Sequence, residues 1–197
     1  AAQGRGRSDD VSDLAALRLG VRVDQPGVRL RDFQTAHHCD TGEAMPVSDR
    51  FYLADAVFLA AFEGAKVLVE ELYQALLAPV YLPYLGRRSC PPARPIPLGT
   101  EEQDLEAALS GHEWLAGEWF KRKRRSEPEV ELGVWLDAGK GHTADHEQRD
   151  VPLSFDQAHR RYAMRGVRYT RVTVPNPRAV SRPSGFVHDP MDALGDE

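Results

Sequence analysis

The sequence has 197 residues, of which 42% are hydrophobic, and a formal net charge of −5. This length and composition predict a globular protein of one or two domains with a substantial core, and the acidic net charge argues against a simple nucleic-acid coat protein. The two cysteines, Cys39 and Cys90, form no CxxC pattern, which argues against a disulfide framework and predicts a reducing, cytoplasmic location. No stretch has the pattern of a signal peptide or a membrane span.

The basic residues are strongly biased toward arginine, which supplies 21 of the 25. Arginine suits bidentate phosphate contacts and stacking on nucleobases. A GC-rich coding sequence produces the same bias, so composition alone leaves nucleic-acid binding open.

The first part of the chain predicts a β-hairpin with a basic face. After a short helix over residues 12–17, which Ser12 is placed to cap, apolar and polar residues alternate on both sides of the turn Asp24-Gln25-Pro26-Gly27. Arg29 and Arg31 fall on the polar face. We expect this hairpin to lead into a thumb-like excursion over about residues 28–48; a plain surface hairpin is the alternative.

Two histidine pairs raise the question of a metal site. His37 and His38 lie on the predicted excursion, within the run His37-His38-Cys39-Asp40. A first-row metal usually takes ligands from separated positions, and the flanking Gly and Asp argue against a helix that would align His142 with His146. We therefore predict no metal and no cofactor.

The stretch from Ser48 to Pro92 predicts strand, helix, strand and basic loop. The apolar run Phe51–Phe62 is typical of a buried central strand, and leucines at helical spacing after Gly64 predict an amphipathic helix on a sheet, ending at Pro79. Val80–Leu85 is predicted as an edge or bulged strand, because its internal proline cannot donate a ladder hydrogen bond.

The loop Gly86–Pro92 places Arg87, Arg88 and Ser89 between a flexible glycine and a stiff proline pair. This arrangement favours phosphate contacts, because two guanidinium groups are presented together. A solvated turn is the alternative.

Beyond the loop, a Pro-rich linker predicts a domain boundary, with a core over residues 1–92 and a second part over 93–197. In the second part we predict an acidic helix over 101–109, strands over 130–136 and 167–174, and a polar loop over 137–149. An apolar stripe at helical spacing is expected to form core or a subunit contact rather than a base-stacking platform; it comprises Trp114, Leu115, Trp119 and Phe120.

The densest positive charge is a run of five basic residues, Lys121, Arg122, Lys123, Arg124 and Arg125, followed by acids that partly offset it. It is either a solvated face or a contact for a nucleic-acid backbone, RNA or DNA. Arg160 and Arg161, just before the last predicted strand, are candidates for the same contact.

Four segments resemble the Cas-five family of repeat-associated RNA-binding proteins, in the form found in the type I-E CRISPR complex Cascade. They are GVRVDQPGVRLRDFQTAHH, SDRFYLADAVFLAAFEG, YLGRRSCPP and DVPLSFDQAHRRYAMRGVRYTRVTVPNP, which together cover most of the chain. The resemblance implies an α+β fold: a ferredoxin-like, RRM-type core with a β-hairpin thumb and a smaller β-containing C-terminal part.

The resemblance also implies partners. A family member of this kind caps one end of Cascade, holds the 5′ handle of the CRISPR RNA and adjoins the backbone subunit CasC and the large subunit CasA, with target DNA reached indirectly or through the basic run and no membrane involved. The family begins with a strand and a helix carrying a Pro-Thr-Lys-Ser-Gly-like segment, whereas this sequence opens at AAQGRGRSDD. We therefore expect the native polypeptide to be longer at its N-terminus.

Three functions follow from these observations. The first is a noncatalytic RNA-binding subunit, with Arg87, Arg88, Ser89 and residues of the excursion as contacts. The second is a metal-independent endoribonuclease, as in another CRISPR subtype, with His37, His38 or Tyr52 as acid and base; in type I-E complexes the resemblance assigns cleavage to the CasE subunit. The third is an interaction protein whose arginines serve only solubility.

Overall fold

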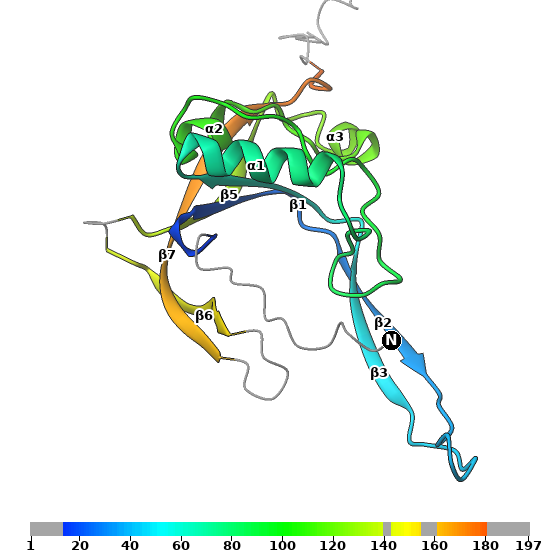
Figure 1. Cartoon of the computed structure of the whole chain (residues 1–197). Helices are drawn as coiled ribbons and strands as arrows, with labels where there is room; N and C mark the ends of the chain where they lie inside the picture. Colours follow the sequence, from blue (N-terminus) through cyan, green and yellow to red (C-terminus); the bar gives the residue numbers. More distant parts are fainter. Residues whose placement is uncertain (1–13, 140–142, 155–160, 181–197) are drawn as a thin grey trace, which may run out of the picture.

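The computed structural model describes residues 14–139, 143–154 and 161–180 (Figure 1). Two sheets and a small number of helices make up this part of the chain, which confirms the α+β class. In chain order the elements are the 3₁₀ helix η1 (Leu14–Ala16), β1 (Arg18–Gln25), β2 (Val28–Gln34), β3 (Ser48–Ala54), β4 (Val57–Glu63), α1 (Lys66–Leu77), α2 (Leu105–Gly111), α3 (Glu118–Lys123), β5 (Glu129–Asp137), β6 (His146–Ser154) and β7 (Arg161–Pro175).

The larger sheet is antiparallel and has the strand order β4-β1-β5-β7-β6. Its longest continuous ladder joins β5 to β7, from Glu129 opposite Pro175 to Asp137 opposite Val167. β1 hydrogen-bonds to β5 as well as to β4, so one sheet runs across the boundary predicted at residue 92. The division into domains at that residue stays a prediction.

The core lies between one face of this sheet and α2. Every second residue of β5 is buried on that face, as expected for a strand with one covered side. Leu105 and Leu109 of α2 pack against Val134 and Leu136, whereas Val130 and Leu132 pack against Trp114 and Ala116, which follow α2. Gly20 permits the close approach of α2, because a Cβ there would lie 2.6 Å from Leu109 Cδ1. The buried side chains of β5 are Val130, Leu132, Val134 and Leu136.

Helix α1 confirms the amphipathic helix predicted after Gly64, and it lies on the same side of the sheet as α2 (Figure 1). Its inner face, formed by Leu68, Val69 and Leu72, is only half-buried, and no residue of the helix is fully buried. The prediction that it lies on a sheet is therefore right in position, but its apolar face is covered much less than that of α2.

The single buried strand predicted over Phe51–Phe62 is wrong. The chain forms two strands, β3 and β4, separated by Asp55 at φ 60°, a left-handed conformation that Asp tolerates better than most residues. β3 belongs to the two-stranded sheet and β4 is an edge strand of the larger one. Phe51, Phe58 and Phe62 are accordingly about half exposed, between 48% and 51%.

The strand predicted over Val80–Leu85 is also wrong. Val80 and Leu82 are each 89% exposed, and this segment pairs with no strand within the described residues. Proline on either side of Val80–Leu82 removes ladder donors, so the apolar pattern alone cannot make a strand here.

The predicted hairpin between Leu19 and Leu30 has the wrong partners. β1 pairs with β4 and β5, whereas β2 pairs with β3, so the true hairpin is the one formed by β2 and β3. The thumb-like excursion predicted over about 28–48 therefore exists, but its return strand extends to Ala54.

Smaller corrections concern the second half. The acidic helix begins only at Leu105, with Asp104 as its N-cap, and β6 begins at His146, inside the predicted polar loop. Trp114 lies between helices rather than on one. The strand predicted over 130–136 is confirmed, and the one predicted over 167–174 is confirmed within the longer β7. No helix among the described residues is long and apolar enough to cross a membrane.

Candidate nucleic-acid interface

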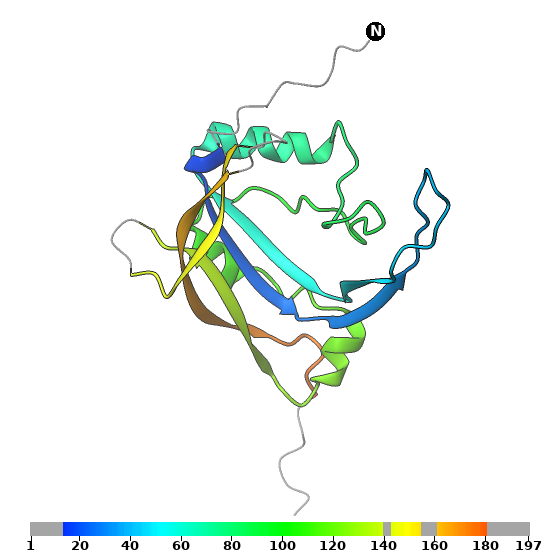
Figure 2. The ribbon, with the colours of Figure 1, turned by 90° about the horizontal axis from the view of Figure 1, so that it is seen from below.

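The β2–β3 hairpin projects from the sheet as a thumb (Figure 2). Every residue of β2 is exposed, and no helix covers either face of the ribbon within the described chain. The junction with the sheet needs two unusual backbone conformations, Gly27 at φ 74° and Asp55 at φ 60°. A Cβ on Gly27 would lie 2.7 Å from the carbonyl oxygen of Ala54, so glycine is required for the two strands to meet there. Gln25 supports the junction by donating from Nε2 to the carbonyl of Asp55 at 2.6 Å.

One face of the thumb combines guanidinium and aromatic groups. The Arg29 guanidinium lies 3.9 Å from the centroid of the Phe51 ring, which is a cation–π contact. Arg31 makes a bidentate pair with Asp49, at 3.0 and 2.8 Å, although its side chain is 69% exposed. Of these two predicted RNA contacts, Arg29 has no carboxylate partner among the described residues, and Arg31 does.

The two histidines at the thumb tip, His37 and His38, each make a hydrogen bond to the backbone of the turn. His37 Nδ1 lies 3.0 Å from the carbonyl of Gly42, a contact that requires a proton on Nδ1, and His38 Nδ1 accepts from the amide of Asp40 at 3.3 Å. Both rings are exposed, so their Nε2 atoms face solvent. The tip therefore presents two imidazole edges whose other nitrogens are fixed by the backbone.

The loop Gly86–Pro92 lies against the base of the thumb (Figure 2). Gly86 has φ 76°, which favours glycine, and the backbone bond from Cys90 N to Arg87 O, at 2.9 Å, closes the turn. The Arg87 guanidinium sits 5.2 Å from the centroid of the Tyr52 ring. Arg88 and Ser89 are exposed beside it, and among the described residues neither arginine pairs with a carboxylate.

Arg29 and Arg87 approach the thumb from opposite faces. In the β2–β3 register Arg29 is opposite Leu53. Tyr52, whose ring contacts the Arg87 guanidinium, is opposite Leu30 on the other face. The structure thus brings Arg87 together with the thumb, a proximity that the sequence did not reveal. Arg50, which shares the Tyr52 face by strand alternation, is a further basic residue that sequence reasoning missed.

The basic run is positioned by a buried polar cluster at the end of β1. Arg22 is fully buried and all five of its N–H groups donate: two to the Asp24 carboxylate, and three to the carbonyls of Leu109, His112 and Glu113, at 2.5 to 2.8 Å. This cluster fixes the segment that runs from α2 to α3.

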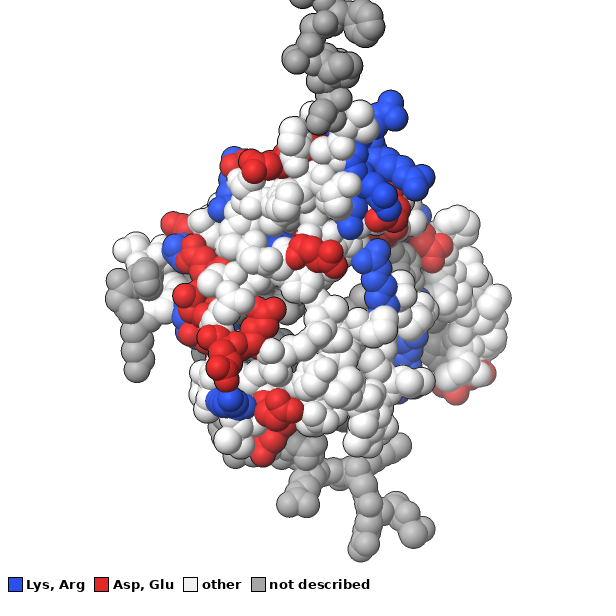
Figure 3. Space-filling view, turned by 90° about the horizontal axis from the view of Figure 1, so that it is seen from above, with Lys and Arg blue, Asp and Glu red and all other residues white. Residues whose placement is uncertain are grey.

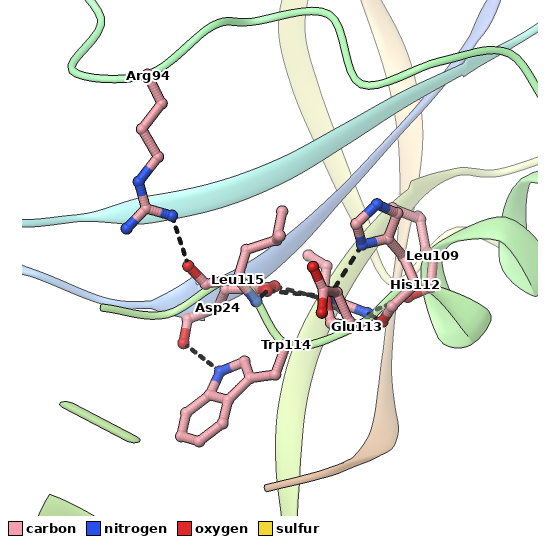
Figure 4. Close-up of polar contacts among 8 residues, drawn as sticks. Asp24, Arg94, Leu109, His112, Glu113, Trp114 and Leu115 are labelled. Carbon is pink, nitrogen blue, oxygen red and sulfur yellow. Dashed lines mark hydrogen bonds and ion pairs between the residues drawn. The ribbon is translucent and has the colours of Figure 1, made fainter. Parts of the chain in front are cut away.

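Asp24 completes the same cluster (Figure 4). Its carboxylate accepts from the amide of Leu115 at 2.6 Å, and its carbonyl accepts from the indole of Trp114 at 2.9 Å. Arg94 of the Pro-rich linker donates to the Leu115 carbonyl at 2.8 Å. Of the predicted apolar stripe, Trp114 is thus core, as expected, and it is held by hydrogen bonds as well as by packing; Leu115 and Phe120 are half-buried, and Trp119 is 52% exposed.

Helix α3 and the residues after it carry the basic run. Lys121 is directed toward Glu118 at 3.8 Å, and Arg124 pairs with Glu127 at 2.5 Å while its guanidinium lies 5.8 Å from the Trp114 ring. The hydrogen bond from Arg124 lowers the pKa of Glu127, so this pair stays ionised at neutral pH.

The other three residues of the run, Arg122, Lys123 and Arg125, have exposed side chains and no ion pair among the described residues. Basic groups at a helix C-terminus are also favoured by the helix dipole. Viewed from above, lysine and arginine side chains gather on the α3 side and acidic side chains on the opposite side (Figure 3).

The segment that follows β7 is hydrogen-bonded to the basic run. Asn176, only 5% exposed, donates to the carbonyls of Lys121 and Arg124 at 3.3 and 2.9 Å. Arg161 is exposed at the opposite end of β7, roughly 45 Å away along an extended strand at about 3.3 Å per residue. Arg161 therefore does not join the basic run, and Arg160 lies outside the described residues.

A family model described as CRISPR-associated protein (Cas_Cas5) matches residues 1–168. The chain belongs to this family. Among curated proteins, the CRISPR system Cascade subunit CasD of Escherichia coli (strain K12) is 41% identical over 78 residues, which are 38% of this chain and 35% of that protein. The match thus spans about a third of the relative's length.

A comparison with solved structures covers more of this chain than the comparison with curated proteins. A chain titled CRISPR RNA-guided surveillance complex aligns with a TM-score of 0.66 and 31% identity, covering 93% of this chain and 79% of that one. The fold of this family member is therefore similar to that of a chain from a CRISPR RNA-guided surveillance complex.

Two features of this CRISPR-associated chain escaped the sequence analysis. Arg22 fell on the polar face of the predicted hairpin and Asp24 in its turn, whereas both side chains are buried and pair with each other; their i, i+2 spacing places them on one strand face but does not signal burial. The contact between Arg87 and Tyr52 left no sequence signal, because it joins segments that meet only in the folded chain.

Proposed function

We propose that this chain is a noncatalytic RNA-binding subunit of a CRISPR Cascade surveillance complex, in which it holds the 5′ handle of the CRISPR RNA and caps one end of the assembly. The observation that carries the proposal is the packing of Arg87 on Tyr52, which places the Gly86–Pro92 loop against the thumb in a member of a CRISPR-associated family. The ferredoxin-like, RRM-type description of the core, and CasC and CasA as neighbours, are parts of this proposal.

The chemistry of the thumb fits a short single strand. Single-stranded RNA exposes phosphates and unstacked bases together, and proteins bind it with guanidinium groups next to aromatic rings. Arg29 beside Phe51 and Arg87 beside Tyr52 supply this combination on the two faces of the thumb base. A strand that wraps around the base meets both, and His37 and His38 line the tip beyond.

The endoribonuclease alternative needs an acid and a base at one phosphate. Tyr52 pairs with Leu30, and the strand from Leu30 to Gln34 alone spans about 13 Å at about 3.3 Å per residue before the tip begins. His37 and His38 lie beyond that point, so Tyr52 cannot share a phosphate with either. We expect no discrete product when the purified protein is incubated with CRISPR repeat RNA; a product lost in His37→Ala or His38→Ala would establish the alternative.

The direct test replaces Arg87 and Arg88 by alanine in the purified protein. We expect weaker binding of 5′-handle RNA and a salt dependence shallower by about 1.4 in the slope of log K against log salt, since each lost phosphate contact removes roughly 0.7. Filter binding over a salt series measures both. The matched control is Arg149→Ala with Arg168→Ala, the same charge change on β6 and β7. Unchanged affinity and slope in the loop variant would contradict the proposal.

We assign the basic run to backbone contact with nucleic acid outside the handle, since Arg122, Lys123 and Arg125 are exposed beside a buried anchor. Replacing these three by alanine is expected to weaken binding of duplex DNA to the complex more than binding of handle RNA. If both ligands bind as before, the run is a solvated face.

A further inference from the structure

Helix α2 covers one face of the larger sheet, and aromatic side chains lie on the opposite face. Trp135 and Tyr169 are directly opposite each other in the β5–β7 register, on the face turned away from α2. Their ring centroids are 4.8 Å apart with an interplanar angle of 52°. They nevertheless remain 40% and 38% exposed. The His146 ring lies 5.6 Å from the Trp135 ring and the Arg171 guanidinium 6.0 Å from the Tyr169 ring, so a further ring would stack on the aromatic surface that these neighbours leave open.

A hollow of about 430 Å³ adjoins these rings. Its volume falls within the roughly 300–1,000 Å³ of small-molecule sites. Gly133 makes room for the Tyr169 ring beside the hollow: this glycine lies between Glu131 and Trp135 on the same strand face, and a Cβ there would lie 3.0 Å from the Tyr169 hydroxyl. The ring of Tyr169 thus leans over a position without a side chain.

The rim of the hollow carries both hydrogen-bond acceptors and donors. Glu131 is exposed and is paired with Arg171 at 2.8 Å, and Arg124 reaches the hollow from the basic run while paired with Glu127. A carboxylate accepts from the amino and imino groups of a base edge, and the guanidinium groups keep further N–H donors for a phosphate. Because the charges balance, the rim favours a flat ring with a polar edge over a run of phosphates.

The position of the hollow connects two regions already described. Val23 and Pro26 line one side, just before Gly27 begins the thumb, and Phe120 and Arg124 of the α3 region line another. The hollow therefore lies next to the point where the thumb begins, within reach of an RNA strand held at the thumb base.

From these observations we propose that the hollow binds one unstacked nucleobase of the RNA strand, sandwiched against Trp135 and Tyr169. The inference rests on the proposed function, because it takes the thumb to hold RNA, but the hollow is a separate site with its own residues. The hollow would contact a nucleobase, whereas the thumb would contact phosphates.

The test uses 5′-handle RNAs with 2-aminopurine at single positions. We expect strong quenching of its fluorescence by stacking at one position, loss of that quenching in Trp135→Ala and Tyr169→Ala, and an affinity lower by about tenfold for each. Trp135→Phe should retain the quenching, because it keeps a ring. Trp119→Ala is the matched control, since Trp119 is 52% exposed outside the hollow. Gly133→Leu places a side chain where the Tyr169 ring lies and displaces that ring, so it should act like Tyr169→Ala without removing an aromatic residue.

Mononucleotides separate this inference from the proposed function. They reach the hollow without the thumb, and they should quench the Trp135 fluorescence in Trp119→Phe protein, where Trp114 is the remaining, buried tryptophan. If mononucleotides quench but handle RNA does not bind, the inference stands and the proposed function fails. If handle RNA binds with equal quenching at every position, and mononucleotides have no effect, the inference is overturned while the proposed function stands.

Discussion

The larger sheet and the thumb are joined by two continuous stretches of chain, yet they are stabilised by different interactions. β1 continues into β2, and β3 into β4, through Gly27 and Asp55. On the sheet side, side chains are buried against α2 and the buried Arg22 makes five hydrogen bonds; on the thumb side, every residue of β2 is exposed. The difference teaches that the sheet can fold by burying its own surface, whereas the thumb depends on backbone pairing and on whatever it binds.

Of the substitutions that test this difference between sheet and thumb, we expect the one at Arg22 to lower the free energy of unfolding most. Replacing it by leucine leaves the Asp24 carboxylate buried with little compensation and removes the donor from three carbonyls, so we expect a loss of about 3–5 kcal/mol in the free energy of unfolding. Urea denaturation measures it. Arg31→Ala, which breaks the exposed pair with Asp49 on the thumb, should cost at most about 1 kcal/mol. Equal losses in the two variants would mean that the thumb shares the sheet's stability.

Two leucines, Leu109 beside the sheet and Leu30 on the thumb, allow the same comparison of stability without changing a charge. Leu109 has no exposed surface, and its replacement by alanine should lower the free energy of unfolding by about 2–5 kcal/mol through lost burial and a cavity. Leu30 on the thumb is 51% exposed, and Leu30→Ala should stay within about 0.5 kcal/mol of the unaltered protein. A large loss from Leu30→Ala would reveal a partner on the thumb of the free protein.

The smallest effect concerns pH and the outer strands of the sheet. The hydrogen bond from Arg165 lowers the pKa of Asp150 below its ordinary value, and Arg165 also pairs with Asp137. A lowered carboxyl pKa stabilises the fold above the unfolded-state value near 3.8, and this stability is lost as pH falls through the folded-state value. Arg165→Gln should therefore narrow the difference between the urea midpoints at about pH 6.5 and about pH 3.5. An unchanged difference would show that the pair contributes no pH dependence.

Sequence patterns alone predicted the elements whose signals are local. Leucines at helical spacing, with Pro79 after them, specify α1, and strict alternation over Val130–Leu136 specifies β5. Gly86 predicted a flexible entry to the arginine loop, and it adopts the positive φ that glycine allows. For the candidate site, the sequence named Arg29, Arg87 and the basic run, because their residue types and neighbours are visible in the chain itself.

The tertiary structure decided which segments meet. The alternation of β1 and β2 fits a hairpin equally well, but β5 lies more than a hundred residues from β1 and becomes its partner only when α2 covers their shared face. The same long-range packing buries Arg22, brings Arg87 onto Tyr52, and sets Trp135 against a Tyr169 ring that lies over Gly133. Strand pairing and burial depend on partners distant in sequence, so the local pattern that specifies an element does not specify what it contacts.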